Sequence, residues 1–109
     1  MHSLLTLHRV VGAGVFLVTL GLYTKTMAPT VSFWDAGEFI SCSYILGVPH
    51  PPGSPLYVLL GRIFSLIPIG SVASRVIFMS ALSSAIAVLF TYLSAVVLAR
   101  RAMGGEALR

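Results

Sequence analysis

The feature that most constrains this chain is a run of 24 residues, 76–99, without a charged side chain. As an α-helix the run is about 36 Å long at about 1.5 Å per residue, which exceeds the roughly 30 Å hydrocarbon core of a bilayer. Serine and alanine are frequent in it, and small side chains let transmembrane helices approach one another. We therefore predict a membrane-spanning helix that packs against other helices.

The composition agrees with residence in a membrane. Hydrophobic residues make up 57% of the 109 residues and charged residues 9%, against about 45–50% and about 25% in globular proteins. So few charged side chains cannot cover the surface of a small soluble domain. Disordered chains, in turn, are rich in charge and poor in apolar residues. Both classes are excluded.

A first apolar segment covers residues 4–23 and is interrupted by His8 and Arg9. Its uncharged part, 10–24, is about 22 Å long as a helix, which is short for a span. Arg9 can reach the membrane surface through its long aliphatic stem, so the helix can begin near Leu4. A cleaved signal peptide is the alternative. We favour an uncleaved span, because Ala28, the best cleavage residue, precedes a proline.

Seven basic residues oppose three acidic ones, for a net charge of +4. They do not cluster as nucleic-acid-binding residues do, and most of them flank apolar runs. They are Arg9, Lys25, Arg62, Arg75, Arg100, Arg101 and Arg109. The Arg100–Arg101 pair favours a cytoplasmic C-terminal end. We predict a plasma (inner) membrane protein with cytoplasmic termini. Residues 1–24 form the cytoplasmic N-terminus and the first span, 25–75 a non-cytoplasmic loop, 76–99 the second span and 100–109 a cytoplasmic tail.

The loop is expected to contain two short helices. The first covers about 33–46 and is opened by a capping box in which Ser32 precedes Asp35. Prolines then interrupt helical structure until a second helix, 55–66. This helix is apolar except for Arg62 and is too short to span, which predicts a position at the membrane interface. The predicted fold is an all-α membrane protein of two spans joined by this loop.

Asp35 and Glu38 are two of the chain's three acids, and their spacing puts both on one face of a helix. One carboxylate could act as general base on an acceptor hydroxyl while the other orients it or binds a cation. Alternatively, both acids only favour the helix dipole. No metal site or other cofactor is predicted, since two acids and one histidine are few for a cage, although carboxylates could hold Mg²⁺.

For each of four further candidate residues, a role in binding competes with a purely structural role. His50 lies among prolines that fix its direction, so it could contact a phosphate or a sugar, or only face water in a rigid turn. Arg62 and Arg75 could bind a phosphate, or anchor helix ends among lipid headgroups. Trp34 could stack on a sugar, or belong to an interfacial aromatic belt.

Three motifs occur in a fixed order: TMAPTV at 26–31, FWDAGEF at 33–39 and VPHPPGSPLY at 48–57. With the flanking spans, they resemble the N-terminal part of a bacterial multi-pass membrane family whose animal relatives are protein O-mannosyltransferases, within the GT-C superfamily. The order is also similar to that in protein mannosyltransferases and lipid A aminoarabinose transferases.

The resemblance implies the N-terminal portion of a GT-C-like fold and transfer of a sugar, mannose or similar, from a polyprenyl-phosphate donor to a hydroxyl of a protein or other acceptor. It implies that Asp35 is the catalytic base with Glu38 as its neighbour. His50 would assist acceptor or donor binding, and Arg62 and Arg75 are weaker candidates for the donor phosphate.

GT-C enzymes have many more spans than this chain. We therefore expect a fragment, a truncated reading frame or one part of a split enzyme, inactive without the remaining transmembrane portion. The competing hypotheses are a two-span hairpin that binds membrane partners without catalysis, and a module that binds lipid phosphate. The latter predicts that Arg62 and Arg75 matter while Asp35 does not.

Overall fold

The computed structural model describes residues 2–32, 34–51 and 53–104. In this part of the chain it contains the helices α1 (His2–Thr26), α2 (Ala36–Ile45), α3 (Pro55–Ser65) and α4 (Val72–Ala102), and no strand. The predicted all-α architecture is confirmed. The expected helix start at Phe33, the second proline of the His-Pro-Pro motif, Pro52, and the C-terminal Arg109 lie outside the described residues.

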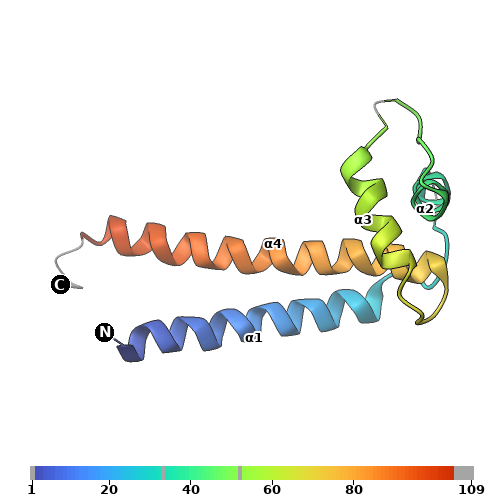
Figure 1. Cartoon of the computed structure of the whole chain (residues 1–109). Helices are drawn as coiled ribbons and strands as arrows, with labels where there is room; N and C mark the ends of the chain where they lie inside the picture. The colour runs from blue at the N-terminus through green and yellow to red at the C-terminus, as the bar shows by residue number, and fades with distance from the viewer. Residues whose placement is uncertain (1, 33, 52, 105–109) are drawn as a thin grey trace.

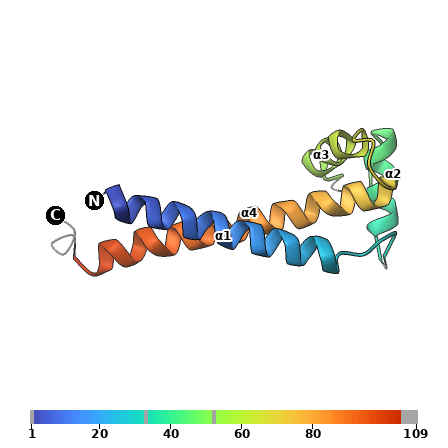
Figure 2. The ribbon, with the colours of Figure 1, turned by 90° about the horizontal axis from the view of Figure 1, so that it is seen from below.

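The long helices α1 and α4 form an antiparallel hairpin (Figure 1), and they cross at a shallow angle when the hairpin is seen from below (Figure 2). α4 begins at Val72, four residues before the predicted start, because Ser71 provides an N-cap. The Ser71 hydroxyl accepts a hydrogen bond from the Ser74 backbone N–H at 3.2 Å. This bond satisfies one of the donors that a helix start leaves unpaired.

Both long helices meet the requirements for membrane spans. The apolar segments are Ser3–Thr26, with 24 residues, and Val72–Ala102, with 31 residues. Only 6% and 11% of their most apolar windows are buried within the structure, which is unlike the core helices of a soluble protein. Apolar surface of this extent requires lipid or another apolar partner. The chain is built as a membrane protein.

The contacts between the two spans include a polar pair and a close approach at a glycine. His8 Nδ1 and the Tyr92 hydroxyl lie 3.0 Å apart and form a hydrogen bond from α1 to α4. Gly12 lies beside Leu89, where an added Cβ would come within 3.3 Å of the leucine side chain. The glycine therefore allows the helices to approach closely at this level.

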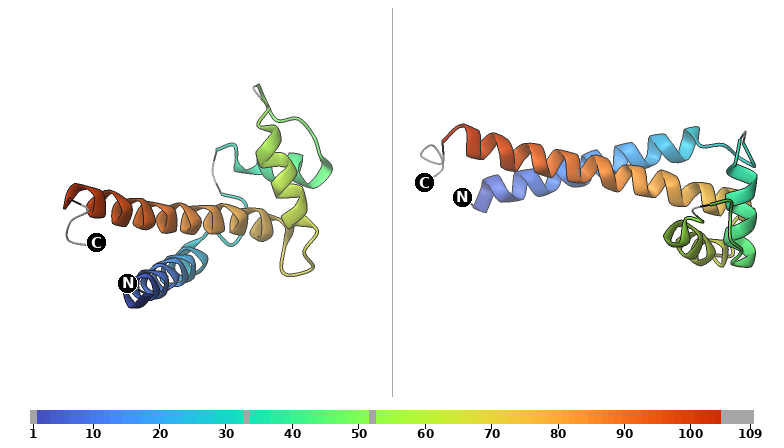
Figure 3. Two further views of the ribbon diagram at one scale, coloured as in Figure 1. Left: turned by 60° about the vertical axis from the view of Figure 1, so that its left-hand side comes forward. Right: turned by 90° about the horizontal axis from the view of Figure 1, so that it is seen from above.

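α2 and α3 lie crosswise at the end of the hairpin that is remote from His2 and Ala102 (Figures 1 and 3). α3 buries Val58, Gly61 and Ser65. Its other face exposes only apolar side chains: Leu56, Leu59, Leu60 and Ile63. A helix that faces outward with apolar residues, at the ends of two spans, fits the predicted interfacial position.

The predicted capping box at the start of α2 is wrong. The N-cap residue is Asp35 rather than Ser32, and its side chain makes no capping hydrogen bond. Trp34 has a φ of 63°, a left-handed conformation that interrupts helical structure just before Asp35. At the other end, the prediction that the helix stops before the prolines is confirmed: Leu46 is left-handed, and the Gly47 N–H donates to the Cys42 carbonyl at 2.8 Å.

Candidate functional site

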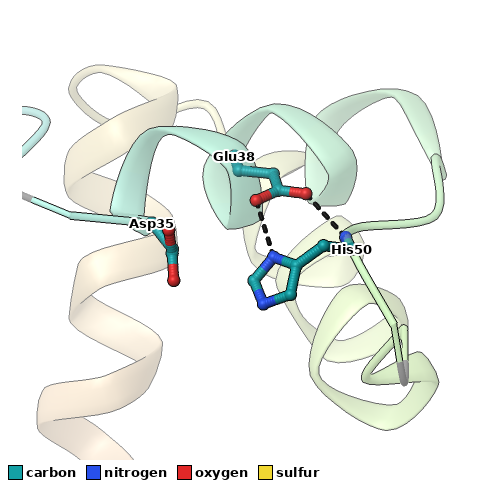
Figure 4. A group of neighbouring side chains, drawn as sticks. All are labelled: Asp35, Glu38 and His50. Atoms are coloured by element: carbon teal, nitrogen blue, oxygen red, sulfur yellow. Dashed lines mark hydrogen bonds and ion pairs between the residues drawn. The ribbon is translucent and has the colours of Figure 1, made fainter.

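The candidate site is built around a doubly hydrogen-bonded pair, Glu38 of α2 and His50 of the following loop (Figure 4). The His50 backbone N–H donates to Glu38 Oε1 at 2.6 Å. The His50 ring Nδ1 lies 2.8 Å from Glu38 Oε2. Both carboxylate oxygens are thus engaged by one residue that lies 12 positions further along the chain.

The sequence around His50 explains how the loop returns to α2. The Gly53 N–H donates to the His50 carbonyl at 3.0 Å, which closes a turn, and Gly53 has a φ of 94° that glycine adopts without strain. The Phe39 ring packs edge-on against the His50 ring, with centroids 5.9 Å apart, and against Tyr57 of α3 at 5.3 Å. Aromatic contacts from α2 and α3 therefore support the imidazole.

Each member of the pair favours the charged form of the other. The hydrogen bond from the His50 side chain, followed by that from its backbone N–H, lowers the pKa of Glu38. The hydrogen bond to Glu38 raises the pKa of His50, and the charges of Glu38 and, more weakly, Asp35 act in the same direction. The site therefore favours a carboxylate beside an imidazolium.

Asp35 completes the cluster. Donor atoms of Asp35, Glu38 and His50 all lie within 4.8 Å of one another. The Asp35 carboxyl is exposed at the start of α2 and is not used to cap that helix. Together the three side chains offer donors that a divalent cation could share. Both Glu38 oxygens already accept hydrogen bonds from His50.

The two candidate arginines bind backbone carbonyls of the protein. The Arg62 guanidinium donates to the Tyr44 carbonyl and lies over the Tyr44 ring, 5.7 Å from its centroid. Arg75 donates to three carbonyls: Ser65 at 2.7 Å, Ile69 at 3.0 Å and Gly70 at 2.7 Å. Both side chains connect helices and loops. The structure does not bring them into the cluster of Asp35, Glu38 and His50.

Trp34 precedes Asp35 and is 96% exposed. A bulky residue with positive φ is uncommon, so the backbone holds this indole outward at a conformational cost. Sequence reasoning missed the direct pairing of Glu38 with His50 and the supporting role of Phe39. No local sequence signal identifies either, because the contacts of Phe39 with His50 and Tyr57 join different elements of the fold.

An apolar cavity of about 420 Å³ lies near the same end of the hairpin. Its wall is formed by the residue that follows α1, by α3 and α4, and by the loop that connects α3 to α4. The lining residues are Met27, Phe64, Ile67, Ile69, Gly70, Ser74, Arg75 and Phe78. It is separate from the acidic cluster and is lined mainly by apolar side chains.

Residues 35–108 match the family model described as the N-terminal domain of protein O-mannosyl-transferase TMEM260. The protein O-mannosyl-transferase tmem260 of Dictyostelium discoideum is 45% identical over 83 residues, which are 73% of this chain and 10% of that protein. TMEM260 of Mus musculus is 40% identical over 74 residues, which are 67% of this chain and 10% of the mouse protein. The chain thus spans about a tenth of these relatives. No solved structure matches it significantly.

Proposed function

The chain belongs to the family of protein O-mannosyl-transferase TMEM260 N-terminal domains, and we propose that it forms part of a membrane glycosyltransferase. The enzyme would move a sugar, mannose or a similar one, from a polyprenyl-phosphate donor to a hydroxyl of a protein acceptor. The observation that carries this proposal is the cluster of Asp35, Glu38 and His50, which lies within the matched region.

The proposed reaction is a displacement at the anomeric carbon of the donor sugar. The acceptor oxygen forms a bond to this carbon while the bond to the lipid phosphate breaks, and the phosphate leaves with the electron pair. Asp35 takes the proton of the acceptor hydroxyl as general base. Its exposed carboxylate, unused by the helix cap, supports this role.

The hairpin also supports a topology. Both helix ends at His2 and Ala102 lie at one end of the hairpin, and α2 and α3 lie at the other (Figure 1). We place the termini in the cytoplasm, with Arg100 and Arg101 at that surface, and the acidic cluster on the non-cytoplasmic side. The apolar cavity beside α1, α3 and α4 is of a kind that can take part of the donor's lipid chain.

The relatives are about ten times as long as the matched segment, so the remaining transmembrane portion of the enzyme would supply further contacts to donor and acceptor. We expect no transfer by the 109-residue chain alone. A non-catalytic hairpin that binds membrane partners is the second candidate, favoured by the largely unburied apolar surfaces of α1 and α4.

The test is sugar transfer by the full-length gene product in lipid nanodiscs, from polyprenyl-phosphate mannose to a serine- and threonine-containing peptide. Asp35→Asn should lower turnover by about 10²–10⁴-fold, the usual contribution of a general base. Glu106→Gln, which removes an acid near the C-terminus of the sequence, is the matched control. Unchanged turnover in Asp35→Asn would overturn the assignment of the base, and absence of transfer by the unmodified enzyme would favour the non-catalytic hairpin.

A further inference from the structure

We propose that Glu38 is a positioning residue that presents the Nε2 atom of His50, together with the Asp35 carboxylate, to the acceptor hydroxyl. The identity of this hydroxyl rests on the proposed function. The orientation of the ring rests only on the geometry of the pair.

The two hydrogen bonds from His50 to Glu38 fix the imidazole. One bond comes from the backbone and one from the ring of the same residue, at 2.6 and 2.8 Å, so the ring cannot turn without breaking the second. An ionised carboxylate only accepts hydrogen bonds. The hydrogen of the ring contact at 2.8 Å must therefore sit on Nδ1, which leaves Nε2 as the nitrogen available to a ligand.

The available nitrogen is on the side of the imidazole that is remote from Glu38. In Figure 4 the second ring nitrogen is turned away from Glu38, on the side of the ring where Asp35 lies. One ligand atom from each of the three residues, for His50 one of its two ring nitrogens, lies within 4.8 Å of the other two. A hydroxyl group bound between the imidazole and Asp35 would contact both, because its oxygen can accept a hydrogen bond from a protonated Nε2 while its O–H donates to Asp35.

The net charge of the cluster favours the acceptor hydroxyl over the donor phosphate as its ligand. With His50 protonated, two carboxylates and one imidazolium leave the cluster with a net negative charge, and with His50 neutral the charge is more negative still. Such a cluster repels the anionic phosphate of a lipid-linked sugar and accepts a neutral hydroxyl. The acceptor, rather than the donor phosphate, is therefore the ligand that His50 contacts.

The first experiment needs no activity. Imidazole ¹⁵N NMR spectra of the 109-residue chain in lipid nanodiscs, assigned with His50→Asn, should show hydrogen on Nδ1 of His50 in every protonation state. Glu38→Gln should disturb this preference, because the amide NH₂ can donate to Nδ1 and stabilise the other tautomer. Asp35→Asn is the matched control and should preserve it. Identical His50 spectra in the unmodified chain and Glu38→Gln, with α4 amide signals preserved, would overturn the positioning role.

The second experiment measures transfer by the full-length gene product. Glu38→Gln should raise KM for the acceptor peptide by about 10-fold, the effect of losing a charge-assisted contact, and leave KM for the lipid-linked donor unchanged. Glu38→Asp, which retains the charge, should recover part of the loss. A rise in donor KM alone would overturn the assignment to the acceptor. If the NMR result holds but the unmodified enzyme transfers no sugar, the proposed function fails while the positioning of His50 stands.

Discussion

Ser43 of α2 and Gly61 of α3 meet where the two short helices cross, and no side chain fits between them. A Cβ added to Gly61 would come within 2.7 Å of the Ser43 Cβ. Ser43 is fully buried, and its hydroxyl donates to the Phe39 carbonyl at 2.7 Å, so it cannot easily move aside. This crossing holds α2, and with it Glu38, against the helix that follows His50.

Gly61→Ala should therefore separate α2 from α3. Overpacking of a close contact typically costs about 1–3 kcal/mol, and we expect a loss of this size in the free energy of unfolding, with faster hydrogen exchange in α2. Gly14→Ala is the control, since nothing lies within 4 Å of its added Cβ. There, alanine should be neutral or stabilising by about 0.5–1 kcal/mol. Equal stability of both variants would show that the crossing is loose.

Arg75→Gln should lower thermal stability rather than donor affinity. The substitution removes donors to the carbonyls of Ser65, Ile69 and Gly70, which hold the end of α3 beside α4. We expect a loss of about 1–3 kcal/mol, since bonds to charged groups contribute more than neutral ones. The measurements are thermal unfolding and KM for the lipid-linked donor. A higher donor KM at unchanged stability would instead support the phosphate-binding hypothesis for this arginine.

Tyr92→Phe should weaken the pairing of α1 with α4. It removes the hydroxyl that contacts His8 and keeps the ring. Hydrogen bonds between transmembrane helices average about 0.6 kcal/mol, so the expected change in unfolding free energy is of that order. A double-mutant cycle with His8→Phe measures it in mixed detergent and SDS. Full additivity of the two substitutions would mean that the bond contributes nothing.

The docking of the loop on α2 should depend on pH. The pKa of Glu38 is lowered from its ordinary value of 4.5, so its contribution is complete above pH 4.5 and disappears as pH falls through the lowered value. The pKa of His50 is raised from 6.5, so its contribution is complete below pH 6.5 and disappears as pH rises through the raised value. The pair therefore stabilises the loop fully between pH 4.5 and 6.5.

Trp34 is the single tryptophan of the chain and directly precedes Asp35. Its fluorescence can therefore be used to follow unfolding as a function of pH. Thermal unfolding midpoints should be highest inside the window and fall on both sides. Glu38→Gln should flatten the profile on both sides of the window, whereas Asp35→Asn should preserve the acid side and weaken the alkaline side only slightly. A midpoint that keeps rising above the window in the unmodified chain would contradict the ion pair. Added salt should reduce the effect, because both side chains are partly exposed.

The long helices and the short helices were predictable from sequence because length, charge placement and prolines act locally. The uncharged run predicts α4, and Pro55 at a first turn predicts α3. The prediction of a capping box is wrong because Trp34 has a positive φ, which no local rule assigns to a tryptophan. Asp35 therefore becomes the N-cap of α2.

The site was predicted as separate residues and not as an arrangement. The spacing of Asp35 and Glu38 identified both acids, but it contains nothing about a loop that returns over 12 residues to place His50 on Glu38. That return depends on the contact of Phe39 with Tyr57, which is tertiary. For the same reason, the binding of both arginines to carbonyls could not be distinguished in advance from a free guanidinium.

The carbonyl contacts of Arg75 have a mechanical consequence. They fix the end of α3 to the start of α4, which at 31 residues is about 46 Å long and exceeds a hydrocarbon core of about 30 Å, so it has room to tilt. Tilting is one way in which a long span adjusts to the thickness of the surrounding lipid. Because the corner is rigid, a change in tilt rotates α3 and the acidic cluster as one body and changes their height above the membrane. Lipid chain length should thus set the height of the cluster of Asp35, Glu38 and His50 above the membrane.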